Sequence, residues 1–512
     1  MRYIAAIDEG TLSARTIIYT SELKIAEISQ LAHKQVTPKP GWLEHDPMEI
    51  YENCCKTLAQ ACMNLREKDK SFKKLDGIGI TNQRETTVVW DRDTGKPLYN
   101  AIVWSDARTY DVVKKVTKEI GNDDMMFASK INGLPASIYF SAFKFRWLLD
   151  NVKAVRDARD RGTLMFGTID TWLIWKLSGG KVHVSDVSNA SRVFLMNLQR
   201  LEWDEELCKK MDIPISSLPR IGSCSEHFCD VAITDFGLPQ ALGGRTPITG
   251  CIGDQQGALV GNMCFETGEA ECTYGTGCFL LMNVGTNVKY SENRLLSTVA
   301  YKFGKEPCRY AIEASIANAG ATVDWMGRNL GFIKHPKEVE GACRRAGGTD
   351  GVVFVPAFGG LFAPYWDPRA RGTIVGMTYK TNKANIMYAA LEAIAMQVHD
   401  NIHAMCEDSG TKVNVLKVNG GLTKNQLLME LQCGVLNTDL MVPDFKEMTS
   451  LGAAICAGLA VGTWKSTDEI KAVAARELKG NTIRPSSTDG ELWKTKLDDW
   501  HRAIKKARWA KL

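Results

Sequence analysis

Two apolar segments of this sequence each end in an aspartate followed by a glycine turn, one near the start and one near the middle. Residues 3–11 carry Asp8, and residues 248–257 carry Asp254. In α/β folds ligands bind outside the carboxyl ends of the strands, so an aspartate at such an end faces the ligand. We predict that the two segments are equivalent strands of two similar domains and direct both acids into one cleft. Such a site would hold a metal-bound nucleotide on one acid and a reacting hydroxyl group on the other.

The length of the chain agrees with two domains. Its 512 residues exceed what one hydrophobic core usually supports, and we place the boundary at residue 250, giving domains over residues 1–250 and 251–512. Segments with the strand pattern, such as residues 75–81, alternate with amphipathic helical segments, such as residues 384–405. This alternation in both halves predicts an α/β fold.

Composition excludes several classes of partner. The net charge of +4 is small for this length and argues against nucleic acid and against an anionic membrane surface. No apolar run approaches the roughly 20 residues that cross a bilayer, so no membrane partner is expected. The fifteen cysteines are scattered without a C-x-x-C pair, which predicts reduced and mostly buried thiols.

Three glycine-rich turns follow apolar strands and are candidate phosphate-binding loops. They are residues 10–13, residues 275–277 and the pair Gly420-Gly421, which opens a helical segment. Glycine lets backbone N–H groups approach a phosphate closely, although most such turns only connect strands. Three turns together with Asp8 and Asp254 favour a nucleotide site.

Two familiar nucleotide motifs do not apply. The sequence has no G-x-x-x-x-G-K-[ST], which excludes a P-loop enzyme. The tripeptide Asp235-Phe236-Gly237 matches the metal motif of protein kinases, but no H-R-D or A-P-E accompanies it, so we interpret it as a loop.

The pair Arg84-Glu85 is the candidate substrate signal. Adjacent side chains of a strand point to opposite faces, so both can reach one ligand only at a strand end. A hydrogen-bond donor beside an acceptor suits a polyol, whose hydroxyl groups both donate and accept. A surface ion pair is the alternative reading of this stretch.

Two longer segments resemble a known family. Residues 139–151 (YFSAFKFRWLLDN) and residues 372–392 fit the two signatures of the FGGY family of sugar kinases, within the actin/Hsp70/hexokinase-like superfamily. Residues 81–90, 101–104 and 273–283 are similar to its glycerol kinase branch in particular. The resemblance covers roughly residues 3 to 465. It implies two duplicated ribonuclease-H-like domains, as in actin-like ATPases, with a deep cleft between them.

The resemblance also implies roles in the phosphorylation of glycerol to sn-glycerol 3-phosphate by ATP, with ADP as the second product. Glycerol would contact Arg84, Glu85, Trp104, Tyr139, Asp254, Gln255 and Phe279, and Asp254 would be the general base. ATP would contact Thr11, Ser13, Arg15, Thr276, Gly320, Gly421 and Asn425. Asp8 would serve Mg²⁺ through water, because this ion gives up its hydration reluctantly.

Two other functions stay open at this point. One is a kinase for another small polyol or sugar of the same family. The other is an actin-like or chaperone-like ATPase, which would share Asp8 and the glycine turns but would have no use for Arg84, Glu85 and Tyr139 around a small pocket. A homodimer is a further expectation at the level of the family.

Two positions depart from the family pattern. Glu9 adds a negative charge beside the expected phosphates, so a metal ion or Arg15 must offset it, or its side chain must point away. Asp324 stands where a glutamine often lines the nucleotide pocket, which puts that contact in doubt.

The chain ends in Ala510-Lys511-Leu512, a small–basic–leucine triplet close to the peroxisomal S-K-L address. A merely basic helix end is the alternative. The ending resembles that of the glycerol kinases that kinetoplastid parasites keep in glycosomes, which are peroxisome-like organelles. It predicts this localisation, with a peroxisomal-type import receptor as a partner.

Overall fold

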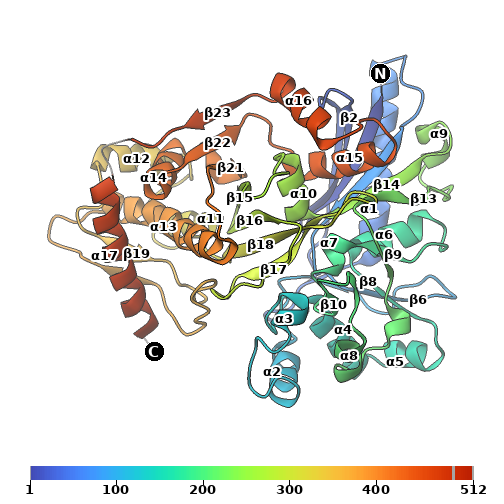
Figure 1. Ribbon diagram of the computed structural model, residues 1–512, viewed down its shortest axis with the longest axis horizontal. Coiled ribbons are helices and arrows are strands. Elements are labelled where there is room, and N and C mark those ends of the chain that lie inside the picture. The colour runs from blue at the N-terminus through green and yellow to red at the C-terminus, as the bar shows by residue number, and fades with distance from the viewer. Residues whose placement is uncertain (1, 487–489, 510–512) are drawn as a thin grey trace.

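The computed structural model describes residues 2–486 and 490–509, which form two domains, each built on a mixed β-sheet (Figure 1). The N-terminal sheet has the order β13-β14-β5-β1-β2-β3, and the C-terminal sheet has the order β17-β18-β16-β15-β21-β22-β23. The strands of the first sheet are β1 (Tyr3–Glu9), β2 (Ser13–Thr20), β3 (Ile25–Ala32), β5 (Gly77–Asn82), β13 (Ser225–Asp230) and β14 (Pro247–Gly253). Those of the second are β15 (Ala270–Tyr274), β16 (Cys278–Gly285), β17 (Leu296–Tyr301), β18 (Arg309–Ile316), β21 (Val415–Asn419), β22 (Asp439–Pro443) and β23 (Gly480–Ile483).

Helices pack on both sheets, on one another and on the connections between strands. They are α1 (Pro47–Lys68), α2 (Tyr110–Glu119), α3 (Ser129–Asn132), α4 (Ser141–Asn151), α5 (Lys153–Asp160), α6 (Ile169–Leu177), α7 (Val187–Ala190), α8 (Glu205–Lys210), α9 (Leu238–Leu242), α10 (Asp254–Gly261), α11 (Gly320–Arg328), α12 (Glu338–Ala346), α13 (Lys383–Ser409), α14 (Gln426–Leu436), α15 (Met448–Ala460), α16 (Thr467–Glu477) and α17 (Gly490–Trp509). Short pairs of strands join the connections: β4 (Glu44–His45) with β7 (Ala101–Ile102), β6 (Val88–Asp91) with β8 (Leu164–Gly167), β9 (Val184–Asp186) with β12 (Arg220–Gly222), β10 (Met196–Asn197) with β11 (Glu202–Trp203), and β19 (Val353–Val355) with β20 (Thr373–Val375).

The two sheets share one topology. In the first, β1 pairs antiparallel with β2 and parallel with β5, and β5 pairs parallel with β14. In the second, β15 pairs antiparallel with β16 and parallel with β21, and β21 pairs parallel with β22. The predicted duplication of an α/β domain is therefore confirmed.

The pairing of the duplicated strands was predicted wrongly. β14, which precedes Asp254, is the last strand of the N-terminal sheet in chain order and lies between β13 and β5, and the strand equivalent to β1 is β15. A boundary at residue 250 would cut through β14, so the first domain extends through α10 instead. The sequence misled because Thr273 occupies the place in β15 that Asp8 occupies in β1, which removes the acid that would mark the repeat.

Helices α10 and α15 join the domains by close backbone contact. A Cβ atom on Gly261 would lie 1.9 Å from Met448 O, and one on Gly452 would lie 2.0 Å from Gly257 O. Any side chain at these glycines would therefore push the helices apart. α15 packs on β1, β5 and β14 of the N-terminal sheet, whereas α10 also contacts β15, β16 and β17 of the C-terminal sheet. The helix pair therefore connects the two sheets.

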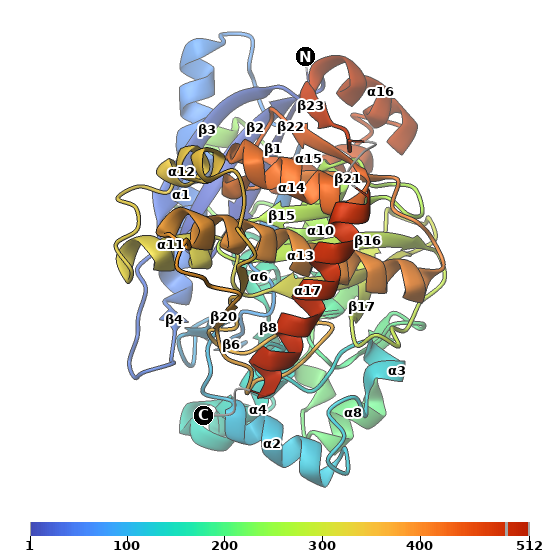
Figure 2. The same ribbon diagram turned by 90° about the vertical axis from the view of Figure 1, so that its left-hand side faces the viewer.

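The last helix, α17, packs across α13 and the β19–β20 pair (Figure 2). Trp493, Trp500 and Ile504 are buried on its inner face. Trp500 Nε1 donates to the buried Asp400 of α13 over 2.7 Å, and His501 Nε2 lies 2.9 Å from the same carboxylate. Residues 510–512, on which the targeting prediction depends, lie outside the described residues.

The predictions about thiols and membranes can be compared with the same structure. All fifteen cysteines are free, and all but the half-buried Cys406 are buried, which confirms the expectation that the thiols are mostly buried. Within the part of the chain that the structure describes, every helix is too short or too polar to cross a bilayer.

Candidate active site

Asp8 and Asp254 meet at one edge of the N-terminal sheet. β1, β5 and β14 are neighbouring parallel strands, so Asp8 at the end of β1, Arg84 just after β5 and Asp254 just after β14 emerge on the same side. Burial is the main cause that raises the pKa of Asp254 to about 7; the charge of Arg84 opposes this rise, and the nearby carboxylates of Glu85 and Asp8 contribute to it. The acids do converge as predicted, but from one sheet and not from two domains.

Asp8 is held by a cation from the neighbouring strand. Arg15 stands opposite Asp8 in the register of β1 and β2, and its Nη2 lies 2.9 Å from Asp8 Oδ2. Its Nη1 lies 3.0 Å from Glu447 Oε2, at the start of α15. Burial raises the pKa of Asp8 and the charge of Arg15 lowers it, while Glu447 raises it. Arg15 is 31% exposed, so the guanidinium is accessible to an anion at this edge.

Glu9 points away from this edge. Because side chains alternate along a strand, Glu9 enters the interior on the face opposite Asp8. Its Oε1 lies 2.9 Å from His33 Nε2, and Gln83 Nε2 donates to its Oε2 over 3.2 Å. Of the possibilities that the sequence left open for Glu9, the structure therefore selects the orientation away from the phosphates.

Arg84 and Glu85 belong to a buried charge network. Arg84 Nε lies 3.1 Å from Asp254 Oδ1, and its two terminal nitrogens reach both oxygens of Glu313 at 2.7 and 2.9 Å. Arg192 Nε donates to Glu85 Oε1 over 2.6 Å, and Arg192 Nη2 donates to Glu313 Oε1 over 3.2 Å. The alternative of a surface ion pair is wrong, because Arg84 and Glu85 are both buried.

An aromatic wall joins the substrate residues to the first glycine turn. The rings of Trp104 and Tyr139 meet edge to face with centroids 5.7 Å apart, and Trp104 Nε1 donates to Thr11 Oγ1 over 3.0 Å. Lys144 of α4 stabilises the backbone that carries Tyr139, because its Nζ donates to the backbone oxygens of Ile138 and Tyr139 over 2.8 and 2.7 Å.

Three of the predicted nucleotide segments converge at the end of β15. The turn after β15 is bound to the start of α11, where Gly320 N donates to Gly275 O over 3.1 Å. Gly420 has φ of +98°, and a Cβ atom there would lie 2.4 Å from Tyr274 O. Only glycine therefore permits this approach, which brings residues 420–424 beside the end of β15.

The structure gives the following positions and contacts for the remaining predicted residues. Asn425 caps α14, with its side chain accepting from Leu428 N over 3.0 Å. Gln255 follows Asp254 on α10, and Phe279 is half-buried on β16 opposite Thr273. Asp324 is half-exposed on α11 and lies 3.8 Å from Arg328. Ser13 Oγ accepts from Gln30 Nε2 over 2.8 Å. The roles of these residues toward a ligand stay predictions.

Sequence reasoning missed Glu313 and Arg192. Both stand alone in apolar segments, Glu313 within β18 and Arg192 before the run Val193–Met196. A charged residue is rarely buried without a partner, so an isolated charge in an apolar strand indicates an internal ion pair. That signal was present, but it does not identify the partner.

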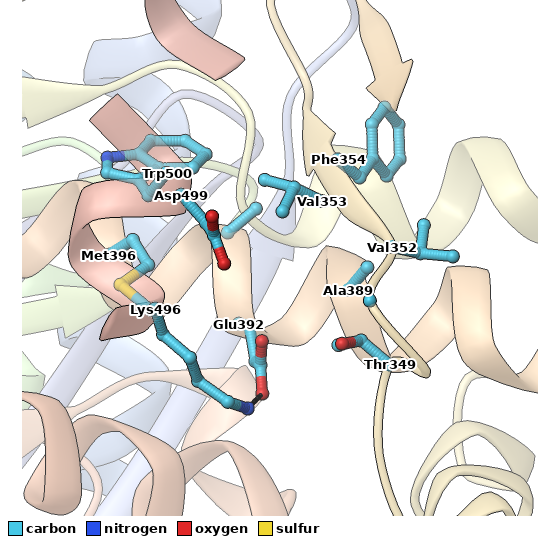
Figure 3. Close-up of a pocket in the computed structure, with 12 residues that line it drawn as sticks. Thr349, Val352, Val353, Phe354, Ala389, Glu392, Met396, Lys496, Asp499 and Trp500 are labelled. Carbon is cyan, nitrogen blue, oxygen red and sulfur yellow. Dashed lines mark hydrogen bonds and ion pairs between the residues drawn. The ribbon is translucent and has the colours of Figure 1, made fainter. Parts of the chain in front are cut away.

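A small cavity of the C-terminal domain is lined by residues that do not belong to this site (Figure 3). It lies between α13, α17 and β19 and is lined by Val352, Phe354 and Met396 and by the ion pair of Lys496 with Glu392. Its volume of about 40 Å³ suits one water molecule and excludes a nucleotide.

Comparison with known proteins decides the family. The model of the N-terminal domain of the FGGY family of carbohydrate kinases matches residues 3–261, and the model of the C-terminal domain matches residues 270–461. The chain belongs to the FGGY family of carbohydrate kinases. The gap between the matches coincides with the end of α10, where the sheet topology of this FGGY kinase also places the boundary.

Relatives of this FGGY kinase match nearly its whole length. A glycerol kinase from Brucella anthropi is 47% identical over 92% of this chain and 92% of its own. One from Francisella philomiragia is 45% identical over 99% of both chains. The crystal structure of Plasmodium falciparum glycerol kinase with ADP has a TM-score of 0.92 and 41% identity, covering 99% of this chain and 98% of that one.

The fold extends to more distant kinases. A ligand-bound xylulose kinase from Lactobacillus acidophilus has a TM-score of 0.85 at 20% identity and covers 100% of this chain and 99% of its own. At this identity the likeness concerns the fold alone.

Proposed function

We propose that this FGGY kinase transfers the γ-phosphoryl group of ATP to a terminal hydroxyl group of glycerol, giving sn-glycerol 3-phosphate and ADP. The observation that carries the proposal is the position of Asp254. Its carboxylate has a pKa raised to about 7, lies 3.1 Å from Arg84 Nε and stands at the sheet edge that also carries Asp8. Relatives that are 43–47% identical over nearly the whole chain are glycerol kinases, which supports the choice of substrate.

The groups around Asp254 suit a small polyol. Arg84 supplies donors and Glu85 supplies acceptors, while the rings of Trp104 and Tyr139 offer an apolar wall to the carbon backbone. Gln255 Oε1 is buried and has no hydrogen-bond partner among the described residues, and a buried acceptor of this kind gains from a hydroxyl donor. These features favour a kinase over an actin-like or chaperone-like ATPase.

The triphosphate would lie between the glycine turns of the two domains. Backbone N–H groups at residues 10–13 and 275–277 and the cation of Arg15 suit its negative charge. Gly320, Gly421 and Asn425 would line the rest of the nucleotide site.

The carboxylate of Asp8 fits Mg²⁺ as a hard oxygen ligand, directly or through water, since this ion usually takes one or two carboxylates together with substrate phosphates. When bound, Mg²⁺ would neutralise the charge of the phosphates. The charge of Arg15 holds Asp8 in place for this role.

The chemical step is assigned to Asp254. Phosphoryl transfer passes through a loose transition state, so positioning and neutralisation of charge supply most of the catalysis. Asp254 accepts a hydrogen bond from the attacking hydroxyl group and then its proton. A pKa near neutral suits this role, because the base is then ionised in a useful fraction while it remains a good proton acceptor.

One assay tests the proposal. ADP release from ATP is measured with and without glycerol, and then with xylulose, gluconate and other small polyols in its place. We expect release to depend on glycerol and to be much faster than with the other acceptors. Fast release without any acceptor would contradict the proposal and favour an ATPase, and a clear preference for another polyol would change the substrate.

The peroxisome-like location remains a separate proposal that depends on Ala510-Lys511-Leu512 alone, because the relatives named above come from bacteria and from Plasmodium. Removal of these three residues should leave a fluorescent fusion in the cytosol of a host with peroxisome-type organelles, whereas import of the shortened protein would refute it. The homodimer is likewise proposed from the family, and sedimentation of the purified protein would test it.

A further inference from the structure

Glu313 connects the two domains at the proposed substrate site. It lies in β18 of the C-terminal sheet, whereas its partners Arg84 and Arg192 belong to the N-terminal domain. All three side chains are buried, and the edge of the C-terminal sheet that carries β17 and β18 lies against α7, next to Arg192 (Figure 1). Further contacts close this junction, including the pair of hydroxyl groups of Ser191 and Thr298 at 2.8 Å.

The five charged groups form one alternating chain. Asp254, Glu313 and Glu85 are its three carboxylates, and Arg84 and Arg192 are its two guanidinium groups. Glu313 accepts from both terminal nitrogens of Arg84, Nη1 also donates to Gln256 Oε1 over 3.2 Å, and Nε lies against Asp254. Through Arg192, the same carboxylate also supports Glu85, the expected acceptor of substrate hydroxyl groups.

We propose that Glu313 is a positioning residue that couples the contact between the domains to polyol binding. It fixes the orientation of the Arg84 guanidinium group and, through Arg192, that of the Glu85 carboxylate. These two groups therefore have the correct orientation for the substrate only while β18 packs against the N-terminal domain. This inference rests on the proposed function. Glu313 itself does not touch the substrate.

The test compares Glu313→Gln with Glu313→Asp and with Glu271→Gln. Glu271 is a suitable control because it is a buried carboxylate of the same sheet whose pKa is raised by burial to about 8, so the neutral glutamine changes little charge at pH 7. Glu313→Asp keeps the charge and serves as the variant to measure if the glutamine variant does not fold.

We expect Glu313→Gln to raise the KM for glycerol at least tenfold while the KM for ATP changes less than threefold. We expect Glu313→Asp to show a smaller increase and Glu271→Gln to show none. The acidic limb of the pH profile should also move to lower pH in Glu313→Gln, since Arg84 is then shared with one carboxylate fewer. A merely structural residue would not move this limb.

Two outcomes would overturn the inference. One is a glycerol KM within threefold of the wild-type value in both Glu313 variants, and the other is an equal rise in the KM values for glycerol and ATP. Failure of the proposed function is distinguishable, because the wild-type protein would then show no glycerol-dependent release of ADP at all.

An independent observation concerns the outer face of α13. His399 and His403 are four residues apart, so their side chains are neighbours on the helix, and their rings have centroids 6.1 Å apart. Both line a surface groove of about 570 Å³ together with Cys406 and Asp439. His399 Nδ1 lies 3.4 Å from Asp400 Oδ1, and His403 Nδ1 lies 3.5 Å from Glu407 Oε1.

A carboxylate beside Nδ1 favours the tautomer that leaves the Nε2 lone pair free, and this is the usual second contact of a metal-binding histidine. We infer that the two Nε2 atoms chelate a divalent transition-metal ion such as Zn²⁺, with water in the other positions. Among the described residues, a group of three ligand atoms within 4.8 Å occurs only at Asp170, Asp186 and Cys251. The carboxylates of Asp170 and Asp186 already accept hydrogen bonds from Ser185 and Asn189, so we propose no metal site there.

Titration calorimetry of the purified full chain with Zn²⁺, without nucleotide, tests the inference. We expect one ion per chain to bind, with at least tenfold weaker binding in His403→Gln. His227→Gln is the matched control, because His227 is also exposed and lies 3.4 Å from a carboxylate, that of Asp230, but has no second histidine one turn away. No measurable binding to the wild-type protein, or equal binding to His403→Gln, would overturn the inference.

Discussion

Arg84 Nε lies 3.1 Å from Asp254 Oδ1, although one residue follows β5 and the other follows β14. The contact exists because β5 and β14 are parallel neighbours whose carboxyl ends share an edge. Arg84 is buried, whereas the side chain of Asp254 is 30% exposed, so the pair presents its carboxylate outward. This relationship underlies most of the expectations for the proposed reaction.

Substitution of Asp254 by asparagine should remove the proton acceptor while keeping the shape of the site. We expect kcat to fall by roughly 10² to 10⁴ while nucleotide binding survives. Coupled measurement of ADP gives the rate, and calorimetry with ATP gives the affinity. A variant with near wild-type kcat would remove Asp254 from the role of general base.

The pH dependence of kcat/KM for glycerol should follow the ionisation of Asp254. Burial raises its pKa to about 7, so the carboxyl group is protonated and inactive at lower pH and becomes ionised as the pH rises. Activity should therefore increase through about pH 7 and then level off. A profile that stays flat between about pH 5.5 and 7 would contradict the raised pKa.

Substitution of Arg84 by alanine should mainly raise the KM for glycerol. Its contact with the substrate is made in the ground state and in the transition state alike, so kcat is affected less. Arg92→Ala is the matched control, since Arg92 is exposed and pairs only with its neighbour Asp93. If only the affinity for ATP changed, the assignment of the polyol site would be wrong.

Glu9→Gln tests the orientation of that side chain. Because Glu9 faces His33 and Gln83 in the interior, we expect the KM for ATP to stay within about twofold, whereas stability should fall by about 1–3 kcal/mol through loss of the buried contact. Urea unfolding measures the second effect. A tenfold change in the KM for ATP would show that Glu9 does act on the phosphates.

Asp400→Ala tests the docking of α17. Burial opposes ionisation of Asp400, but hydrogen bonds from His399, His501, Tyr365 and Trp500 outweigh this and lower its pKa. Loss of this acceptor should destabilise the protein by about 3 kcal/mol, measured by urea unfolding.

Asp499→Ala is the control for this experiment. Asp499 lies on α17 itself but pairs with Arg502 near the surface, so a loss of about 0.5 kcal/mol or less is expected. Equal effects of the two substitutions would mean that Asp400 does not hold the helix.

Local chemistry was readable from the sequence wherever the signal was itself local. The spacing of apolar residues predicted α13, and the glycine turn of residues 275–277 lies between two paired strands. The prediction that β1 and β14 are duplicates was wrong because it relied on an aspartate at the end of each segment, whereas strand equivalence depends on hydrogen-bonded order within each sheet.

The sequence by itself determined that two α/β units would place Asp8, Asp254 and an arginine–glutamate pair at strand ends, because period-two apolar runs, glycine turns and lone acids are features of neighbouring residues. Only the tertiary structure decided that both acids leave one sheet, that Glu9 faces inward and that Glu313 reaches from the other domain to Arg84 and Arg192. The physical reason is that a buried charge requires a partner but does not specify one. Which partner meets it depends on strands brought together from distant parts of the chain.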